Sequence, residues 1–511
     1  MEEKYYLNIS KASDLENPRE RKLYRFFEIF PGMMSLGTLF GVLVFSWLFP
    51  SLVAIFIIIF CFYYLFRILY FSLHQIIGYF RVKFNMKRNW LQELKKTKGK
   101  NWKDIYHVII LPTYKEGKEI IEETLDTLIE SDYPKEKIIV VLATEKRAGI
   151  FFENQARDIE KKYSSRFCKF LVTVHPDDII GEIGGKGSNT AWAGKEVKKL
   201  VDGLKVSYEN ILISTFDIDT KIFSQYFACV TWYYLTEENP TRASYQPVPV
   251  YNNNIWTANF FSRVVATSNT FWQMIQQERS EKLTTYSSHS TPAKVFFDIE
   301  YPANIVQDDS RIFWKAYLAY DGNYRAVPIY YMVSMDAVET KNFFKTVLNQ
   351  YKQQRRWAWG CAEIPYIMFG FLKNKKIPFW SKFGHLYTIL DGFWSWATAA
   401  LLLFLFGWLP ILLGGQKFNF SVLSFNLPIL TGQIMTIGMV GMFVSAILST
   451  MLLPPVPKEF KWYKRWYKKS TVFIQWVFLP VTLILFGSLP AIDAQIRLMF
   501  GKYMGFWVTD K

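Results

Sequence analysis

The stretch from His107 to Arg147 reads HVIILPTYKEGKEIIEETLDTLIESDYPKEKIIVVLATEKR. Its two ends are apolar runs rich in β-branched residues, which predict buried strands at 107–114 and 137–145. Between them, apolar residues recur at helical spacing and predict a helix that stops at Pro134. A strand, helix and strand in this order are typical of a parallel sheet covered by helices on both faces.

The same pattern continues downstream. FLVTVHP at 170–176 and ILISTFDID at 211–219 predict two more strands, with a helix at 190–204 between them. The fold class is therefore α/β, with a parallel sheet whose ligands bind beyond the carboxyl ends of the strands. Two regions, 150–168 and 279–304, fit neither pattern, and we expect the polar second region to form a mobile loop over the site.

Long apolar windows flank this soluble region. The chain has 511 residues, half of them hydrophobic, with 45 Phe, 30 Tyr and 18 Trp. Windows of spanning length lie at 32–49, 51–72, 384–413, 427–453 and 471–490. The first is no secretory signal peptide, because some thirty polar residues precede it and a second window follows at once. The sequence thus predicts a large soluble domain inserted between transmembrane helices.

The net charge of +16 is concentrated beside the apolar windows, at 81–88 and 458–469. Lys and Arg next to spans favour the cytoplasmic side, so we expect a multi-pass protein of the cell membrane with a cytoplasmic central domain. Anionic lipids of the bilayer account for this charge, and no nucleic-acid-binding motif accompanies it. The four cysteines lack CxxC spacing, which argues against a disulfide framework and a zinc site.

Polar residues follow three of the predicted strands: 112–116 (PTYKE), 144–147 (TEKR) and 217–219 (DID). Asp217 and Asp219 are two apart, so an extended backbone directs both carboxylates to one side. Paired carboxylates suit Mg²⁺ or Mn²⁺ bound to substrate phosphates. A pair of acids two residues apart is common, and an ordinary solvated end of a strand also explains it.

Two further motifs carry polar groups. The turn GGKGSN at 184–189 precedes a helix, so its backbone and Lys186 could hold a phosphate, although it is not a Walker A sequence. Asp308 and Asp309 open a predicted helix as part of QDDSR. They could compensate the helix dipole, or one of them could be a general base that accepts a proton from a hydroxyl nucleophile.

Taken in order, PTYKE, GGKGSN, DID, QDD and the element Gln353-x-x-Arg356-Trp357 resemble the membrane-integrated glycosyltransferases of family 2, which include cellulose, hyaluronan and poly-N-acetylglucosamine synthases. The likeness covers roughly residues 30–410. It implies a GT-A fold, a cytoplasmic active site, a divalent metal and a nucleotide-sugar donor, with a UDP-sugar favoured. It also implies inversion at the anomeric carbon and therefore a β-glycosidic bond.

The resemblance also implies a role for each motif. Asp309 would be the catalytic base, with Asp308 as a competitor because the triplet reads QDD where the family has TED. The metal would lie on Asp219 and Asp217, and Arg356 would face the diphosphate. The remaining residues would bind substrate: Thr113, Glu116, Glu145, Lys186 and Asp217 on the donor side, with Gln353 and Trp357 below the acceptor sugar. Glu145 replaces the family's usual aspartate.

These assignments divide the chain into seven parts. We predict that Arg355 and Trp359 face lipid headgroups, and that Asp391 lies where its span begins. The parts are a cytoplasmic N-terminal segment (1–31), two transmembrane helices (32–75), a juxtamembrane linker (76–104), the GT-A domain (105–335), interfacial helices with QxxRW (336–380), about three transmembrane helices (381–490) and an amphipathic C-terminal tail (491–511).

Several acceptors fit this organisation. A growing polysaccharide, with synthesis coupled to secretion, is the first reading, and accessory export or regulatory subunits would suit it. A single transfer to a lipid or polyprenyl-phosphate-linked acceptor is the alternative, since it needs only a lateral opening. A transporter or a scaffold with an inactive transferase domain is a third hypothesis, which predicts that acids are missing from the strand ends.

Overall fold

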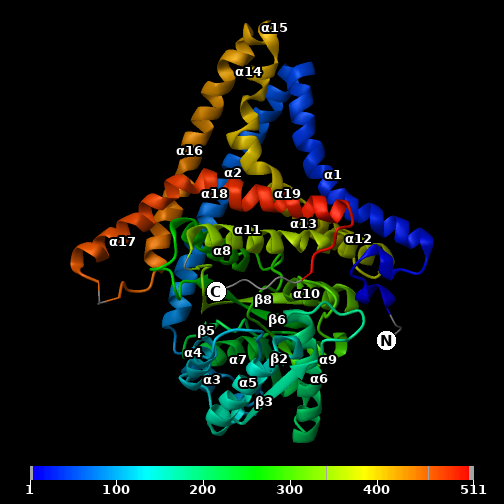
Figure 1. Cartoon of the computed structure of the whole chain (residues 1–511), viewed down its shortest axis with the longest axis vertical. Coiled ribbons are helices and arrows are strands. Elements are labelled where there is room, and N and C mark those ends of the chain that lie inside the picture. The colour runs from blue at the N-terminus through cyan, green and yellow to red at the C-terminus, as the bar shows by residue number, and fades with distance from the viewer. Residues whose placement is uncertain (1–3, 341, 458–459, 506–511) are drawn as a thin grey trace.

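The structure is a computed structural model that describes residues 4–340, 342–457 and 460–505. Figure 1 shows a sheet domain at one end and a bundle of long helices that extends away from it. The sheet domain lies in the chain between the second and third of these long helices.

In the part of the chain that the structure describes, one sheet of eight strands forms the centre of the domain, in the order β3-β2-β1-β4-β7-β6-β8-β5. The first four strands of this order are parallel, as predicted. The prediction of a wholly parallel sheet is wrong, because β7 is antiparallel to β4 and β6 and β5 is antiparallel to β8, although β6 and β8 are parallel to each other. The strands are β1 Tyr106–Pro112, β2 Ile138–Glu145, β3 Lys169–His175, β4 Ile211–Thr215, β5 Lys221–Ile222, β6 Ala243–Tyr251, β7 His289–Pro292 and β8 Arg325–Met335.

The polar region 279–304 contains β7, so it is not the mobile loop that we expected. β7 is buried although it reads HSTP, because its hydroxyls have partners on the neighbouring strands. Ser290 lies 2.7 Å from the Ser214 hydroxyl of β4, and Thr291 lies 2.9 Å from that of Ser244 in β6. Buried polar side chains are tolerated where they are hydrogen-bonded, and such strands lack an apolar signature.

Helices cover both faces of the sheet (Figure 1). The unassigned region 150–168 contains a helix, and the helix after β1 ends at Ile129, earlier than the predicted stop at Pro134. Residues after Ile129 turn toward β5, where the amide of Asp132 donates to the carbonyl of Ser224. The helices of this domain are α3 Trp90–Lys96, α4 Lys118–Ile129, α5 Ile150–Tyr163, α6 Lys186–Leu204, α7 Tyr226–Thr236, α8 Phe260–Gln277, α9 Ala293–Ile299 and α10 Asp308–Ala319.

Among the described residues, five helices are long and apolar enough to cross a membrane, which agrees with the five windows of the sequence. The window 384–413 is not one continuous helix, because α13 ends at Phe404 and two short helices follow. The bundle consists of α1 Pro18–Leu48, α2 Pro50–Lys87, α13 Phe379–Phe404, α14 Leu409–Leu413, α15 Gly415–Asn419 and α16 Val422–Leu452.

The fifth apolar helix has a different direction. It runs from Trp462 to Met499 as α17 Trp462–Ile474, α18 Leu479–Leu483 and α19 Leu489–Met499. Figure 1 shows it lying across the ends of the other long helices, on the side of the sheet domain. The predicted span at 471–490 therefore belongs to a helix that lies crosswise to the bundle, and the predicted tail begins inside that helix.

The crosswise helix packs on two further helices, α11 Phe343–Ala358 and α12 Glu363–Lys373, which lie between the sheet domain and the bundle. Two predictions for this layer are wrong. Arg355 does not face headgroups but pairs with Asp493 of α19 at 2.8 Å, and Trp359 is buried in an apolar cluster with Ala491 and Ala494. These two side chains contact protein and not lipid headgroups, because α19 covers them.

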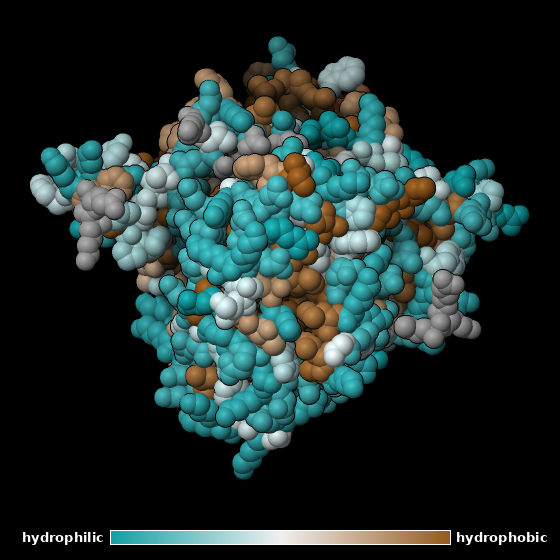
Figure 2. Space-filling view, turned by 60° about the horizontal axis from the view of Figure 1, so that its bottom comes forward, coloured by the Kyte–Doolittle hydropathy of each residue, from teal (hydrophilic) through white to brown (hydrophobic). Residues whose placement is uncertain are grey.

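The two parts differ in surface character. Figure 2 views the sheet domain from its free end, and hydrophilic residues dominate this face. Exposed large apolar side chains are numerous on the bundle instead, among them Phe40, Trp47, Leu52, Ile59 and Phe66. Asp391 lies near the middle of α13, where it pairs with Arg67 of α2 at 2.9 Å.

Candidate active site

The carboxyl ends of β1, β2 and β4 converge on the first turn of α6. Lys186 is the first residue of this helix, so GGKGSN is partly helical and not wholly a turn before it. Gly185 has φ +155° and ψ −165°, a conformation essentially restricted to glycine. At Gly187 a side chain would have no room, because a Cβ there would lie 2.8 Å from the carbonyl oxygen of Pro302. The glycines therefore allow α6 to approach the segment that leads into α10.

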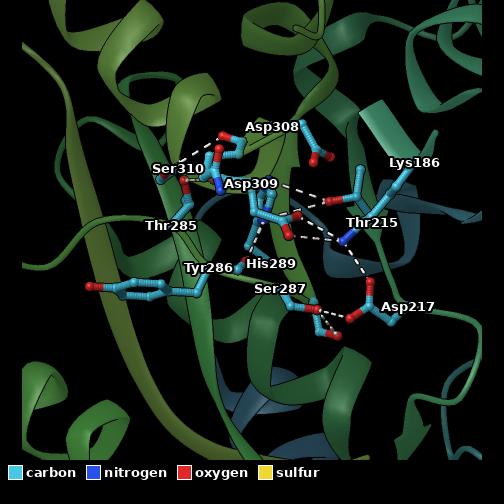
Figure 3. Close-up of polar contacts among 12 residues, drawn as sticks. Lys186, Thr215, Asp217, Thr285, Tyr286, Ser287, His289, Asp308, Asp309 and Ser310 are labelled. Atoms are coloured by element: carbon cyan, nitrogen blue, oxygen red, sulfur yellow. Dashed lines mark hydrogen bonds and ion pairs between the residues drawn. The ribbon is translucent and has the colours of Figure 1, made fainter. Parts of the chain in front are cut away.

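Lys186 joins two of the predicted acids. Its Nζ lies 2.7 Å from Asp217 Oδ1 and 2.8 Å from Asp309 Oδ1, as Figure 3 shows. Burial on its own lowers the pKa of Lys186, but the charges of Asp217 and Asp309 outweigh burial and raise it above its ordinary value. The ammonium therefore stays charged and holds residues from three elements in one cluster.

The two carboxyls of QDD have different surroundings. Asp308 is 2% exposed and accepts a hydrogen bond of 2.9 Å from the Tyr301 hydroxyl. Burial, followed by the adjacent charge of Asp309, raises the pKa of Asp308 to about 7. The Asp309 side chain is 25% exposed and faces Lys186. Of the two, Asp309 is the carboxyl that a ligand at the strand ends can reach.

The segment before β7 supplies residues that the sequence did not identify. Thr285 donates to the backbone oxygen of Asp309 at 2.6 Å, and Ser287 donates to Asp217 Oδ2 at 2.6 Å. His289 accompanies them, with its Nδ1 2.9 Å from the oxygen of Tyr286, and burial lowers its pKa. A run of small hydroxyl residues in an unassigned polar stretch was the available signal, although such runs are also common in loops.

A second group lies at the ends of β1 and β2. Thr113 donates to Glu116 at 2.8 Å, which places two predicted donor-binding residues together. Glu145 is buried and pairs with Arg147, whose guanidinium carbon lies 4.6 Å from the ring centre of Tyr114. A carboxylate, a stacked cation and an aromatic face are suited to a planar, polar ligand such as a nucleoside.

The first turn of α6 joins this second group to the acid cluster. The side-chain amide of Asn189, one turn after Lys186, donates to the carbonyl of Ala143 in β2 at 2.6 Å. Gly184 packs against the Arg147 guanidinium, where a Cβ would lie 3.2 Å away. Polar side chains thus follow one another along the carboxyl ends of the strands from Glu116 to Asp309.

Helix α11 carries the QxxRW residues. Gln307, the first residue of QDD, donates from its side-chain amide to the backbone oxygen of Arg356 and so links α10 to the end of α11. Trp357 lies with its ring centre 6.0 Å from that of Tyr251, at the end of β6. Gln353 is on the buried side of α11 and accepts from Gln350 at 3.2 Å.

Tyr251 connects Trp357 to the acids, and the sequence did not identify it. Burial, and then the charges of Asp217, Asp219 and Asp309, raise its pKa, so its hydroxyl lies near all three carboxylates. Its strand was not predicted because Pro247 and Pro249 interrupt it, and proline is rare inside a sheet.

The DID residues lie in a turn beyond β4 and not in extended backbone, so the argument from alternation does not apply to them. Asp219 is buried and its Oδ2 accepts from the amide of Asp336 at 3.0 Å, while Asp217 faces Lys186. Within the described residues, no three Asp, Glu, His or Cys side chains converge as a ligand group. Two carboxylates are nevertheless the protein ligands that Mg²⁺ commonly has when phosphates supply the rest.

Comparison with known proteins gives distant likenesses. No family model matches the chain, and no curated protein matches it in sequence. Solved structures that resemble it include glycosyltransferases bound to nucleotide sugars. The mannosyltransferase PcManGT from Pyrobaculum calidifontis, in complex with GDP-Man and Mn²⁺, is 15% identical with a TM-score of 0.38, and the match covers 83% of this chain and 98% of that one.

Two others are similar at the same level. TarS 1–349 from S. aureus, in complex with UDP-GlcNAc, is 14% identical with a TM-score of 0.36, over 80% of this chain and 95% of that one. GalNAc-T7 with UDP, GalNAc and Mn²⁺ is 9% identical with a TM-score of 0.34, over 56% and 58% of the two chains. At these TM-scores, a functional proposal has to be built on the residues of the site.

Proposed function

We propose that the protein is an inverting glycosyltransferase of the membrane, which transfers a sugar from a nucleotide-sugar donor to an acceptor hydroxyl. One observation carries the proposal: Lys186 brings Asp309, the candidate base, together with Asp217, the candidate phosphate-side acid, at 2.8 and 2.7 Å. The order of the motifs, PTYKE to QxxRW, supports the same reading and favours a GT-A domain of the family 2 type.

On the donor side, Glu145 and Arg147 would bind the nucleoside, with Thr113 and Glu116 beside it. Asp217 and Asp219 fit a divalent ion, Mg²⁺ or Mn²⁺, because their carboxylate oxygens are hard ligands and lie beyond the carboxyl end of β4. When bound, such an ion would neutralise charge on the donor diphosphate. Lys186 and Arg356 would place fixed positive charge where negative charge develops on the leaving diphosphate. Such charges lower the reaction barrier more than they tighten binding of the donor.

On the acceptor side, Asp309 would take the hydroxyl proton while that oxygen attacks the anomeric carbon. The bond from this carbon to the diphosphate breaks as the new bond forms on the opposite face. A single displacement of this kind inverts the carbon, so an α-linked donor gives a β-glycoside. Trp357 and Tyr251 offer aromatic faces for the acceptor sugar, beside the buried Gln353.

We further propose that the enzyme lies in the cell membrane with the sheet domain in the cytoplasm, and that its donor is a UDP-sugar. The acceptor would be a growing polysaccharide or a lipid-linked acceptor. A transporter or a scaffold with an inactive domain is disfavoured, since acids are present at the strand ends. Mass spectrometry of the product formed from a panel of UDP-sugars separates polymer from glycolipid, and the absence of any product would contradict the proposal.

Neighbouring aspartates provide the sharpest test of the base. Asp309→Asn should lower sugar transfer by about 10²- to 10⁴-fold, the usual contribution of a general base, while donor binding persists. Asp308→Asn is the matched control, since Asp308 is buried and bonded to Tyr301. Transfer rates and donor titrations of both variants decide the matter. A fully active Asp309→Asn enzyme, or a larger loss in Asp308→Asn, would refute the assignment.

A further inference from the structure

Three basic side chains gather where the bundle meets the sheet domain, outside the acid cluster. Arg67 lies on α2 and forms the ion pair with Asp391 of α13. Arg279 follows α8 in the chain, and its guanidinium carbon lies 5.8 Å from the ring centre of Tyr70, one turn from Arg67. Lys282 comes three residues later. We call Arg67, Arg279 and Lys282 the boundary cations.

The positive charge of the boundary cations exceeds the negative charge of the acids around them. Burial lowers the pKa of Lys282, and the positive charges of Arg279 and Arg67 lower it further, against the opposing charges of Glu281 and Asp391. In the described part of the chain, Arg279 and Lys282 form no ion pair, and the Arg279 Nε is buried without a hydrogen-bond partner. Half-buried cations without an anion are costly, so this arrangement favours binding of an anion from outside the chain.

Their position points to a lipid. Arg67 lies about 25 Å along α2 from Pro50 at 1.5 Å per residue, close to the roughly 30 Å thickness of the hydrocarbon core of a bilayer. The cations are therefore at the depth of the phosphates on the side of the sheet domain. Arg pairs with phosphate through two parallel hydrogen bonds, and Tyr70 provides an aromatic face beside it.

The same segment leads to the active site. Thr285 lies three residues after Lys282, so the Cα atoms of these two residues are at most about 11 Å apart. Thr285 donates to the backbone oxygen of Asp309. Ser287 then contacts Asp217. Figure 3 shows the ring of Tyr286 directed away from Lys186, and the charge of Arg279 acts on this Tyr286. The segment 279–288 thus carries two of the boundary cations at one end and contacts Asp309 and Asp217 at the other.

We propose that the boundary cations bind the phosphate group of a membrane lipid that serves as the sugar acceptor, which rests on the proposed glycosyltransferase function. With the phosphate there, a hydroxyl carried by the lipid's head group would extend along 279–288 to Asp309. The new bond joins this oxygen to the anomeric carbon, the bond from that carbon to the nucleoside diphosphate breaks, and the hydroxyl proton passes to Asp309. Soluble phosphate has the same chemistry, so the test has to separate the two sources.

The experiment uses the full chain in phosphatidylcholine nanodiscs, with dioleoyl phosphatidic acid as the probe and native mass spectrometry as the readout. The double variant Arg279→Gln/Lys282→Gln should bind the probe about tenfold more weakly or worse. Lys464→Gln/Arg465→Gln removes two exposed charges from α17 and is the matched control, expected to change binding less than about twofold. Asp391→Asn removes the carboxylate that competes for Arg67, so it should bind more tightly, a gain that misfolding cannot imitate.

The outcomes separate the two proposals. Equal loss in both double variants means a general attraction to the surface and overturns the lipid site, as does probe binding that millimolar inorganic phosphate abolishes. Donor binding and slow hydrolysis of the UDP-sugar should persist in Arg279→Gln/Lys282→Gln, because the donor site is untouched. If the wild-type protein bound no nucleotide sugar yet kept the selective lipid effect, the glycosyltransferase proposal would fail and the phosphate site would stand.

Discussion

Replacing Gly187 by alanine tests how closely α6 and α10 must approach each other at the candidate site. A Cβ at this position would lie 2.8 Å from the Pro302 oxygen and 2.9 Å from Asp308 Cβ. Carbon atoms pack best at about 3.5–4.0 Å, so α6 and α10 would have to separate by roughly 0.5–1 Å. Overpacking of this kind costs about 1–3 kcal/mol. Since Lys186 and Asp309 lie on the two elements that separate, transfer should fall by roughly 10- to 100-fold.

The same helix contains a matched control. Gly203 also lies in α6, but nothing is within 4 Å of a Cβ built there. Gly203→Ala should stabilise the protein by up to about 1 kcal/mol, because alanine is the better helix former, and leave transfer unchanged. Thermal unfolding followed by fluorescence, with initial rates of sugar transfer, measures both effects. If Gly187→Ala proves as stable and as active as Gly203→Ala, the close approach is not needed for catalysis.

Three further predictions concern the acids, the arginines and the metal. Folding raises the pKa of Asp308 from 3.8 to about 7, so its contribution to stability is fully present below pH 3.8 and is lost as the pH rises to about 7. Asp308→Asn should therefore flatten the fall in unfolding temperature between about pH 4 and 7. Arg356→Gln should lower transfer by about 10²–10³-fold, whereas Arg355→Gln should cost about 1 kcal/mol of stability or less and spare transfer, since Arg497 still pairs with Asp493. Chelation with EDTA should abolish transfer and Mn²⁺ or Mg²⁺ should restore it, with activity in EDTA counting against a metal.

Much of the first half of the sheet could be predicted from the sequence. β1, β2 and β4 are buried on both faces, so their sequences are continuous apolar runs that carry a strong signal. β7 and β6 carry no such signal, because hydroxyls stabilise the first and two prolines interrupt the second. Their places in the sheet depend on partners distant in the chain, which single-sequence patterns do not contain.

The residues of the candidate site were likewise predicted where their segment had a sequence signal and missed where it had none. Lys186, Asp217 and Asp309 were predicted from short motifs and lie in contact in the structure, although their catalytic roles stay predictions. Tyr251 and Ser287 were missed because each comes from a segment whose strand was missed. Arg355 was misplaced for a different reason: α19, which covers it, is more than a hundred residues away in the sequence.

The packing of α19 against α1 makes the layer beneath the candidate site depend on a late part of the chain. Arg25 of α1 donates to the carbonyl oxygens of Leu498 and Met499, and Tyr503 donates to Glu28 at 2.9 Å. α19 also pairs with α11, the helix that carries QxxRW. α19 follows all the other described helices in the chain, so the layer beneath the candidate site can form only after α19 has been synthesised. A chain truncated before α19 would therefore leave α11 uncovered.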